Sequence, residues 1–460
     1  MKTKFITLIM AFIVFTITSN AQETEATRLL QEHNKEFVPE IFKFGEKVHF
    51  AVGYDVSNVA MIEGETGIII IDAGMSPIRM EALRLKFREI TNKPIKGILI
   101  THGHGDHFGG IQAFLDEGSN PQVWGRSGAL GNDTGFNIEA NAGEKAGLTY
   151  GNVRGGRQAG IILPDSIHIN NGVAPKPDKQ RTMFTRGKET AKFSPTHLFT
   201  EERKQIEIDG VKFELVAASG ETYDNMYIWM PEEKILFCGD TYYKSFPNLY
   251  TIRGSQYRDV KSWYESLDKM QEDKPEYLLP GHTRPVIGKE NVNTTLTNYR
   301  DAVKFVFDKT IEGINKGLTP DQLVAYVKLP ENLASLPYLT EYYGRVDWAV
   351  RSIFYGYLGW FDGNPVNLNK LAPKTEAEKM AKLAGGENKL KEMAFNAFEE
   401  GDFQWAAQLS DYLLELNQNN KEIINLKADA LMEIAKTMIT ATGRNYMNSY
   451  AIQMKEKIKE

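Results

Sequence analysis

The sequence predicts an α/β fold that is followed by a helical region. Short apolar runs that are typical of buried strands alternate with an amphipathic helical pattern before residue 100, and a similar alternation returns after Glu207. From Val292 onward the apolar residues fall at helical spacing. With 460 residues, of which 42% are hydrophobic, the chain can form two or three separate cores. We therefore expect a leader over residues 1–21, an α/β domain over 22–290 and a helical domain over 291–460.

The start of the α/β domain shows this order of elements clearly. Residues 49–60 and 61–72 have the composition of paired strands and contain turn residues. Ser76 is suited to cap the next helix, with Pro77 at its first position. The helix would cover the sheet with the apolar residues that fall on one of its faces: Met80, Leu83, Phe87 and Ile90.

In the second domain, helices are expected over residues 294–311, 320–327 and 345–358, and then from 375 to the end. The third helix and the residues after it carry more aromatic area than one helix face needs for packing: Trp348, Phe354, Trp360 and Phe361. Two explanations are open at this point, core packing and a subunit interface.

Residues 124–192 form the least regular part of the sequence and are rich in Gly, Asn and Pro. A connection of this length in a compact domain is typical of a lid over a site or of an interface loop, and both interpretations are open. His168 and His197 belong to no motif, so we expect them to be structural or exposed.

The N-terminus has the organisation of a signal peptide. Lys2 and Lys4 precede an apolar stretch over residues 5–17, and small residues lead to Ala21. The stretch is too short for a membrane span, and no later segment approaches twenty apolar residues. We therefore expect a periplasmic or secreted protein with no stable membrane anchor. A formal net charge of −6 provides no electrostatic surface for nucleic acid.

The chemistry is concentrated in residues 101–110, which read THGHGDHFGG after an apolar run. Neutral imidazoles and carboxylates are ligands that zinc prefers. Gly103 and Gly105 remove side chains that would prevent the metal-type residues of the motif from turning inward together: His102, His104, Asp106 and His107.

Other polar groups follow other predicted strands. Asp72, Glu221, Asp240 and His282 come after apolar runs that end near residues 71, 217, 237 and 279. Because loops at the carboxyl ends of strands converge on one crevice in open α/β sheets, we expect these side chains to join the histidine motif.

These residues, in this order, resemble the metallo-β-lactamase superfamily over roughly residues 45–290. The resemblance implies a four-layer αββα sandwich that binds two metal ions, zinc or, given three carboxylate ligands, manganese or iron. It assigns His102, His104 and Glu221 to the first metal and Asp106, His107 and His282 to the second, with Asp240 bridging them. Asp72 is implied to accept a hydrogen bond from the N–H of a ligand imidazole and so to fix its tautomer.

Glu221 stands where the superfamily commonly has histidine. Its negative charge would offset the charge of the metals, so we expect a milder Lewis acid and a separate cation for an anionic substrate. Arg253, shortly after Asp240 in the sequence, is the candidate for that cation.

Glu221 and the LYTIRG segment over residues 249–254 together resemble the alkyl sulfatases of this superfamily. The motifs YGRV from residue 343, YLGWFDGNP from 357 and LAGG from 383 resemble that family's helical dimerisation domain. The resemblance implies a small-molecule sulfate ester as substrate, Arg253 as the residue that grips the sulfate and Tyr150 as a second contact. It also implies a homodimer.

Three features depart from the family pattern. One is the Gly-rich segment over residues 126–172, which differs from the family's usual sequence. Asp240 stands where the best-known alkyl sulfatases have Glu, and the sequence up to Glu460 has no counterpart of the sterol-carrier-like domain that commonly follows. The length of the alcohol chain is therefore not predicted.

The sequence predicts a secreted hydrolase of alkyl sulfate esters, in which Asp240 orients the hydroxide that the metals make available near neutrality. One alternative is a dimetal hydrolase of another ester, a lactone or a phosphodiester on the same scaffold. The other is a secreted binding or assembly protein with a structural metal centre. The predicted ligand set argues against the latter, because structural zinc sites are closed by four protein ligands.

Overall fold

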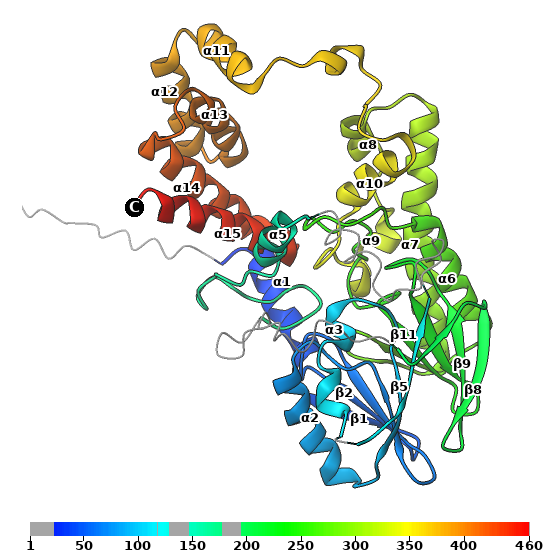
Figure 1. The fold of residues 1–460 in the computed structure, drawn as a ribbon. Helices are drawn as coiled ribbons and strands as arrows, with labels where there is room; N and C mark the ends of the chain where they lie inside the picture. The colour runs from blue at the N-terminus through cyan, green and yellow to red at the C-terminus, as the bar shows by residue number, and fades with distance from the viewer. Residues whose placement is uncertain (1–22, 117, 128–146, 177–194, 460) are drawn as a thin grey trace, which may run out of the picture.

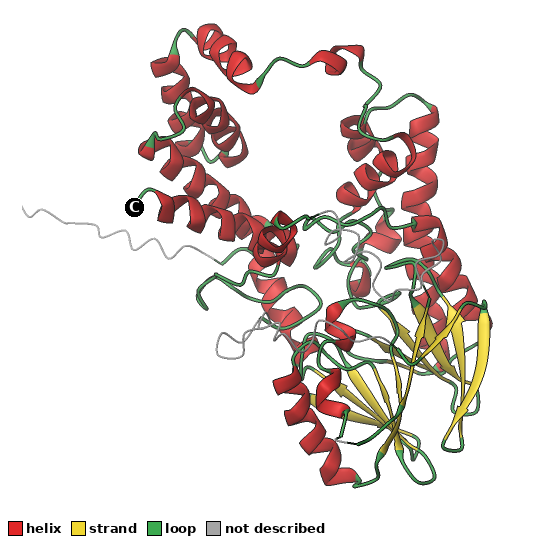
Figure 2. Cartoon of the chain, viewed as in Figure 1, coloured by secondary structure: helices red, strands yellow, loops and turns green. Residues whose placement is uncertain are grey.

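The computed structural model describes residues 23–116, 118–127, 147–176 and 195–459 (Figures 1 and 2). The predicted leader lies outside these ranges. Two β-sheets pack face to face and helices cover their outer faces, which makes the four layers that the sequence predicts. Further helices follow in the C-terminal part (Figure 2). The predicted fold class is confirmed.

The first sheet begins as an antiparallel meander and continues with parallel strands after β4. Ile68–Ile71 of β4 are four buried isoleucines, and such β-branched residues favour a strand that is covered on both faces. The spatial order follows the chain: β1 (Glu40–Phe44), β2 (Val48–Val52), β3 (Val59–Glu63), β4 (Ile68–Ile71), β5 (Ile95–Leu99), β6 (Gln122–Arg126) and β7 (His197–Phe199).

The second sheet is antiparallel except for the pair β11 and β12, which run in parallel. The crossover between these two strands contains α6 (Val260–Glu272), which buries Trp263 and Leu267 against the outer face. The strands of this sheet lie in the order β13 (Val286–Ile287), β12 (Tyr277–Pro280), β11 (Ile235–Gly239), β10 (Met226–Met230), β9 (Val211–Ala217) and β8 (Arg203–Ile208).

The outer face of the first sheet is covered by α2 (Pro77–Ile90), which has Ser76 as its N-cap. Met80, Leu83 and Phe87 are buried as predicted. Ile90 ends the helix and stays 42% exposed, so the last turn does not reach the core.

Helices α7 (Lys289–Asn315), α8 (Pro320–Tyr326) and α10 (Val346–Leu358) follow β13 and share the core on the outer side of the second sheet. An extended stretch with the short η5 (Pro365–Asn369) leads to a second group of helices, which stands apart in Figure 1. That group consists of α11 (Pro373–Ala384), α12 (Glu387–Glu399), α13 (Phe403–Leu416), α14 (Lys421–Thr437) and α15 (Ala441–Lys457). Its last two helices return to the α/β part, where α14 contacts α1 (Glu25–His33) and α15 contacts α5 (Tyr150–Gln158).

No helix in the described part of the chain has both the length and the hydropathy that a bilayer crossing needs. The strands β9, β11 and β12 share one direction, so their carboxyl ends lie at one edge of the second sheet. The residues that follow these ends meet those that follow β4 and β5 of the first sheet, and the candidate site lies at this junction.

Candidate metal centre

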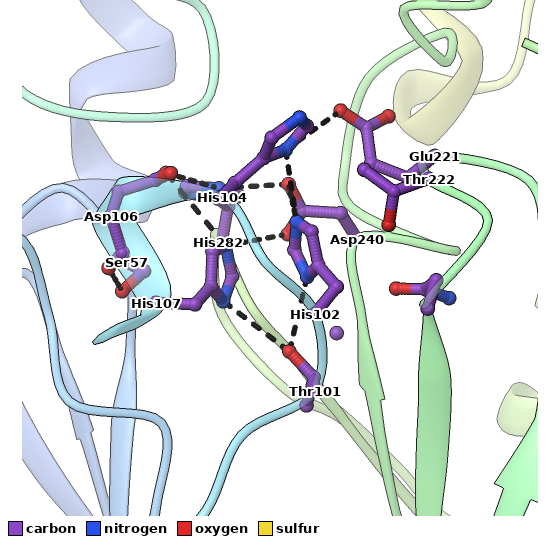
Figure 3. A network of polar contacts seen from close by, with 12 residues as sticks. Ser57, Thr101, His102, His104, Asp106, His107, Glu221, Thr222, Asp240 and His282 are labelled. Carbon is purple, nitrogen blue, oxygen red and sulfur yellow. Dashed lines mark hydrogen bonds and ion pairs between the residues drawn. The ribbon is translucent and has the colours of Figure 1, made fainter. Parts of the chain in front are cut away.

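The side chains that the sequence predicts as metal ligands lie together in one cluster (Figure 3). Three groups each have one nitrogen or oxygen atom per residue within 4.8 Å of the others. The groups are Asp106, His107 and His282; His104, Glu221 and Asp240; and His102, His107 and Asp240. The first group has the composition predicted for the second metal, and Asp240 belongs to both of the other groups.

The histidine motif turns sharply after β5 into the single turn of α3 (Gly105–Phe108). His104 has an extended backbone at the N-cap position, and Asp106 and His107 lie within the turn. The hydroxyl of Ser57 donates a hydrogen bond to the backbone carbonyl of Asp106 and so fixes the turn from the side of the first sheet. This local geometry brings residues that are close in sequence to face one point.

Asp72 fixes the orientation of His107. Its Oδ2 lies 2.7 Å from Nδ1 of His107, while its Oδ1 accepts the backbone N–H of Thr101 at 2.8 Å. A proton on Nδ1 leaves the lone pair of Nε2 for a metal. His282 is oriented in the same way, because its Nδ1 lies 2.9 Å from the carbonyl oxygen of Val56.

The remaining contacts link the two sheets. Nε2 of His282 lies 3.2 Å from Oδ2 of Asp240 and 3.4 Å from Oδ2 of Asp106. Nδ1 of His104 lies 3.0 Å from Nε2 of His102 and 3.4 Å from Oε1 of Glu221. Atoms that carry lone pairs therefore converge from both sheets.

The donor set fits divalent cations. Nε2 of His107 and Oδ1 of Asp240 are buried and lie 3.3 Å apart, yet neither makes a hydrogen bond within the described part of the chain. Buried polar atoms of this kind are costly unless a partner satisfies them, and a metal ion bound by both atoms would do so. The residues present therefore suit the metal ions that the sequence predicts.

The protonation states differ between the imidazoles. Burial and the neighbouring histidines hold the pKa of His102 well below its ordinary value, so its ring is neutral, as a metal ligand must be. Burial also opposes the charge on His282, but Asp240 and Asp106 outweigh it and raise the pKa to about 10. A metal ion bound by His282 at neutral pH would therefore have to displace a proton from its ring.

Gly281 lies between the end of β12 and His282 and allows the backbone there to approach the cluster closely. A Cβ atom there would lie 2.5 Å from Oδ1 of Asp240 and 2.7 Å from Cε1 of His107. At Gly105, within the histidine motif, a Cβ would meet nothing within 4 Å. The requirement for glycine therefore lies at residue 281 and not at Gly105, one of the two glycines, Gly103 and Gly105, for which the sequence predicted it. For Gly103 it stays a prediction.

Arg258 is a site residue that the sequence analysis missed. Its Nη1 donates to Oε2 of Glu221 at 2.6 Å, and both side chains are almost fully buried. The negative charge of Glu221 does predict a nearby cation, but the same segment contains two arginines, Arg253 and Arg258. Whether Arg258 is buried beside Glu221 depends on how that segment packs. Arg258 lies directly before Asp259, the N-cap of α6.

Tyr343 is the second residue that was missed, because its YGRV motif indicated only the family resemblance. It precedes α10, and its ring lies against Tyr243, which in turn lies against His282. Burial and the Glu221 carboxylate raise the pKa of its hydroxyl to about 12, so the phenol stays protonated at neutral pH. The helical part of the chain thus contributes a hydrogen-bond donor near the cluster.

Arg253 is half-buried and lies near the same cluster, since its positive charge acts to lower the pKa of both Glu221 and Tyr343. Its backbone N–H donates to Oε1 of Gln158 at 2.9 Å, and the hydroxyl of Thr251 donates to the same oxygen at 3.0 Å. Gln158 ends α5, which therefore supports the segment that carries Arg253.

Tyr150 begins α5 and is 54% exposed. Its hydroxyl accepts a hydrogen bond from Nη1 of Arg157 at 3.1 Å, and the guanidinium of Arg157 lies against Tyr446 and Tyr450 of α15. The contacts of Tyr150 are thus with the interface between α5 and α15. Its predicted role as a sulfate contact stays a prediction.

Comparison with protein families matches residues 52–282 to the metallo-beta-lactamase superfamily and residues 319–457 to the alkyl sulfatase dimerisation family. A linear primary-alkylsulfatase from Pseudomonas sp. is 34% identical over 405 residues, which cover 86% of this chain and 74% of that protein. An alkyl/aryl-sulfatase from Saccharomyces cerevisiae is 29% identical over 91% of this chain, which spans 64% of the length of the yeast protein.

A solved structure has the same overall fold. The stereoselective inverting sec-alkylsulfatase Pisa1 from Pseudomonas sp. superimposes with a TM-score of 0.83 at 29% sequence identity, over 94% of this chain and 67% of that chain. The resemblance noted in the sequence is confirmed by these matches.

Proposed function

We propose that this chain, which belongs to the alkylsulfatases of the metallo-β-lactamase superfamily, hydrolyses sulfate esters of alcohols to sulfate and the free alcohol. The observation that carries the proposal is that a buried cluster of metal-type ligands and a half-buried arginine lie in one chain with the helical region typical of these enzymes. A sulfate ester is an anion, and such a site offers it cationic partners.

The metal centre in this proposal holds two divalent cations, zinc in the first instance, with manganese or iron as alternatives. Asp106, His107 and His282 would hold one cation, and His102, His104 and Glu221 the other, with Asp240 between them. When bound, such cations lower the pKa of water so that hydroxide is available near neutrality. Asp72 keeps His107 in the tautomer that leaves Nε2 free for the metal.

The sulfate group would be held by residues on the side of the cluster next to α5. Arg253 supplies a permanent positive charge, and its backbone is held by Gln158. Tyr343 remains protonated at neutral pH and can donate a hydrogen bond to an ester oxygen. Tyr150 would take part from α5. These groups orient the ester, and no protein nucleophile is needed.

Turnover of a graded panel tests the proposal. Purified chain loaded with zinc is given hexyl, octyl and dodecyl sulfates and one aryl sulfate, with a generic phosphodiester as the competing substrate. Release of sulfate from the alkyl esters, lost on chelation and restored by zinc, is expected. A phosphodiester that is cleaved far faster than every sulfate ester would contradict the assignment. Arg253→Ala is expected to raise the KM for the best ester about tenfold, because a charged hydrogen bond to the substrate is lost.

We further propose that residues 1–21 direct the chain to the periplasm or the medium and are removed. Fractionation of the producing cells, with N-terminal sequencing of the mature chain, tests this. A mature protein that begins at Met1 and stays in the cytoplasm would contradict it. We also propose that the remaining chain is divided into an α/β domain over 22–290 and a helical domain over 291–460.

The chain is also proposed to act as a homodimer. The end of α10 and the stretch that joins the two groups of helices carry large apolar side chains that are at least half exposed: Tyr357, Leu358, Trp360, Val366, Leu368 and Leu371. A monomer rarely leaves such a set in water, and a second copy of the chain would cover it. This supports the subunit-interface explanation for Trp360 over core packing.

A further inference from the structure

The carboxylate of Glu221 uses its two oxygens for different partners. Oε1 faces His104 at 3.4 Å, on the side of the metal ligands, and Oε2 accepts the hydrogen bond from Arg258 at 2.6 Å (Figure 3 shows the first contact). Only 3% of the Glu221 side chain and 1% of the Arg258 side chain are exposed. Solvent therefore screens this pair very little.

Arg258 is itself held in place. Its Nη1 also donates to the carbonyl oxygen of Asn248 at 2.6 Å, and the backbone N–H of Asn248 donates to the hydroxyl of Tyr243 at 2.7 Å. The guanidinium thus connects the loop that carries Glu221 to the segment that follows Asp240. An arginine stays protonated in a protein, so its charge is permanent.

The pair changes the charge balance of the site. A glutamate in the place of a neutral histidine adds one negative charge, and the adjacent Arg258 adds one positive charge. The weaker Lewis acidity expected for the metals took only the charge of the Glu221 carboxylate into account. With the arginine included, Glu221 and Arg258 together carry the same net charge as a histidine ligand.

We propose that Arg258 is a positioning residue for the metal centre. It holds Glu221 so that only Oε1 faces the metal ligands, and it cancels the added charge, so the two residues act as one neutral unit. This inference rests on the proposed metal-binding function. It makes the two residues interdependent, because replacement of either one alone disturbs the site, whereas both can be replaced together.

A double-mutant cycle on the full chain tests this interdependence. The variants are Glu221→His, Arg258→Gln and the double variant Glu221→His/Arg258→Gln, and Arg444→Gln is a control because Arg444 is a buried arginine that bonds to Thr27 and Lys436 instead. Zinc affinity is measured by competition with a chromophoric chelator, and zinc content by elemental analysis. Neither readout requires turnover.

Glu221→His alone is expected to weaken zinc binding about tenfold or more, because it leaves the Arg258 charge unpaired beside the cations. The double variant is expected to return to within about threefold of the parent, and Arg444→Gln to bind zinc like the parent. A double variant that is as weak as Glu221→His, or weaker, would overturn the inference. Arg258→Gln on its own is expected to weaken zinc binding about threefold or more, because Glu221 is then no longer held with Oε1 towards the metal ligands. It should also weaken inhibition by inorganic sulfate, since the carboxylate is then uncompensated.

Loss of folding does not leave the question open. If Arg258→Gln alone does not fold, the double variant is still expected to fold and to bind zinc, because no buried charge is then left without its partner. A double variant that also fails to fold overturns the inference. A parent chain that binds no zinc contradicts the proposed function itself, whereas a parent that binds zinc and a cycle that is additive contradict only the role of Arg258.

Discussion

Among single residues, Gly281 shows how close the backbone after β12 comes to the predicted metal ligands. In Gly281→Ala the new Cβ would lie 2.5 Å from Oδ1 of Asp240 and 2.7 Å from a carbon of His107, closer than real Cβ atoms come. Both ligands would have to move, so we expect zinc affinity to fall by about tenfold or more while the fold is kept. Gly105→Ala, in the histidine motif but with open space around it, is the control and should bind zinc normally. Equal zinc affinities of the two variants, measured by chelator competition, would contradict this view of the site.

At the same scale, the sequence predicts part of the candidate site: the histidine motif, but not the neighbouring residues that complete it. The motif from His102 to His107 carries its own geometry, because the residues are adjacent and follow a buried strand. The positions of Arg258 and Tyr343 depend on how α6 and the segment before α10 pack on the second sheet. No local pattern in the sequence records that packing.

Among the elements, α5 supports the segment that carries Arg253. The side-chain carbonyl of Gln158 accepts two hydrogen bonds, from Thr251 and from the backbone of Arg253. Gln158→Leu keeps the size of the side chain but loses both bonds, so Arg253 should lose its fixed position. We expect the KM for an alkyl sulfate to rise about tenfold with unchanged zinc content. Gln205→Leu, on the exposed strand β8, is the matched control, and a change confined to kcat would contradict the positioning role.

We expect two buried histidines, His33 and His168, to make the packing of α1 and α15 sensitive to acid. Burial lowers the pKa of both His33, at the end of α1, and His168 to about 4. Nε2 of His168 lies 3.1 Å from Oδ1 of Asn171 and 3.3 Å from Nδ2 of Asn445 in α15. The charged residues that act on His168 are Lys176, which lowers its pKa, and Asp165, which raises it.

The sign of the effect follows from these pKa values. An unfolded histidine has a pKa of about 6.5, so below that pH the unfolded chain binds protons that the folded chain excludes. The stability from each neutral histidine is fully present above about pH 6.5 and is lost as the pH falls towards 4. Between pH 6.5 and pH 5 the loss is about 2 kcal/mol for each residue.

His168→Gln tests this sign, because glutamine cannot gain the proton. The difference in unfolding free energy between the parent and His168→Gln, measured in denaturant with chelator present, should shrink by about 2 kcal/mol from pH 7 to pH 5. A difference for His168→Gln that stays constant over this range would show that His168 is not the titrating group.

In the whole molecule, the end of α10 and the stretch after it form one place where large apolar side chains of the described residues are exposed. Trp360 is 69% exposed and Leu358 is 54% exposed. The double variant Leu358→Ser/Trp360→Ser should shift the chain from dimer to monomer in sedimentation velocity, because the apolar contact between subunits is lost. Leu85→Ser, 60% exposed on α2, is the control and should leave the dimer intact. A parent chain that sediments as a monomer would remove the basis for the proposed interface.

The architecture of the whole chain was predictable to different depths. The alternation of strands and helices is recorded in local apolar patterns, such as the four isoleucines of β4. The four-layer arrangement came from the family resemblance, because periodicity alone does not say which sheet faces which. The return of α14 and α15 to the α/β part was not predicted, since it joins Asn445 to Asn170 across the length of the chain and no local signal marks such contacts.

The contact between α15 and α5 supports Arg253 and is separate from the elements that supply the predicted metal ligands. The metal ligands are supplied from both sheets, whereas the support of Arg253 runs through Gln158 to a helix whose Gln453 accepts a hydrogen bond from Arg157. If Arg253 binds the sulfate group as proposed, substitutions in α15 are expected to change the binding of the anion without changing the predicted metal ligands. Under that proposal, residues hundreds of positions away from the histidine motif would help to set which esters this chain prefers.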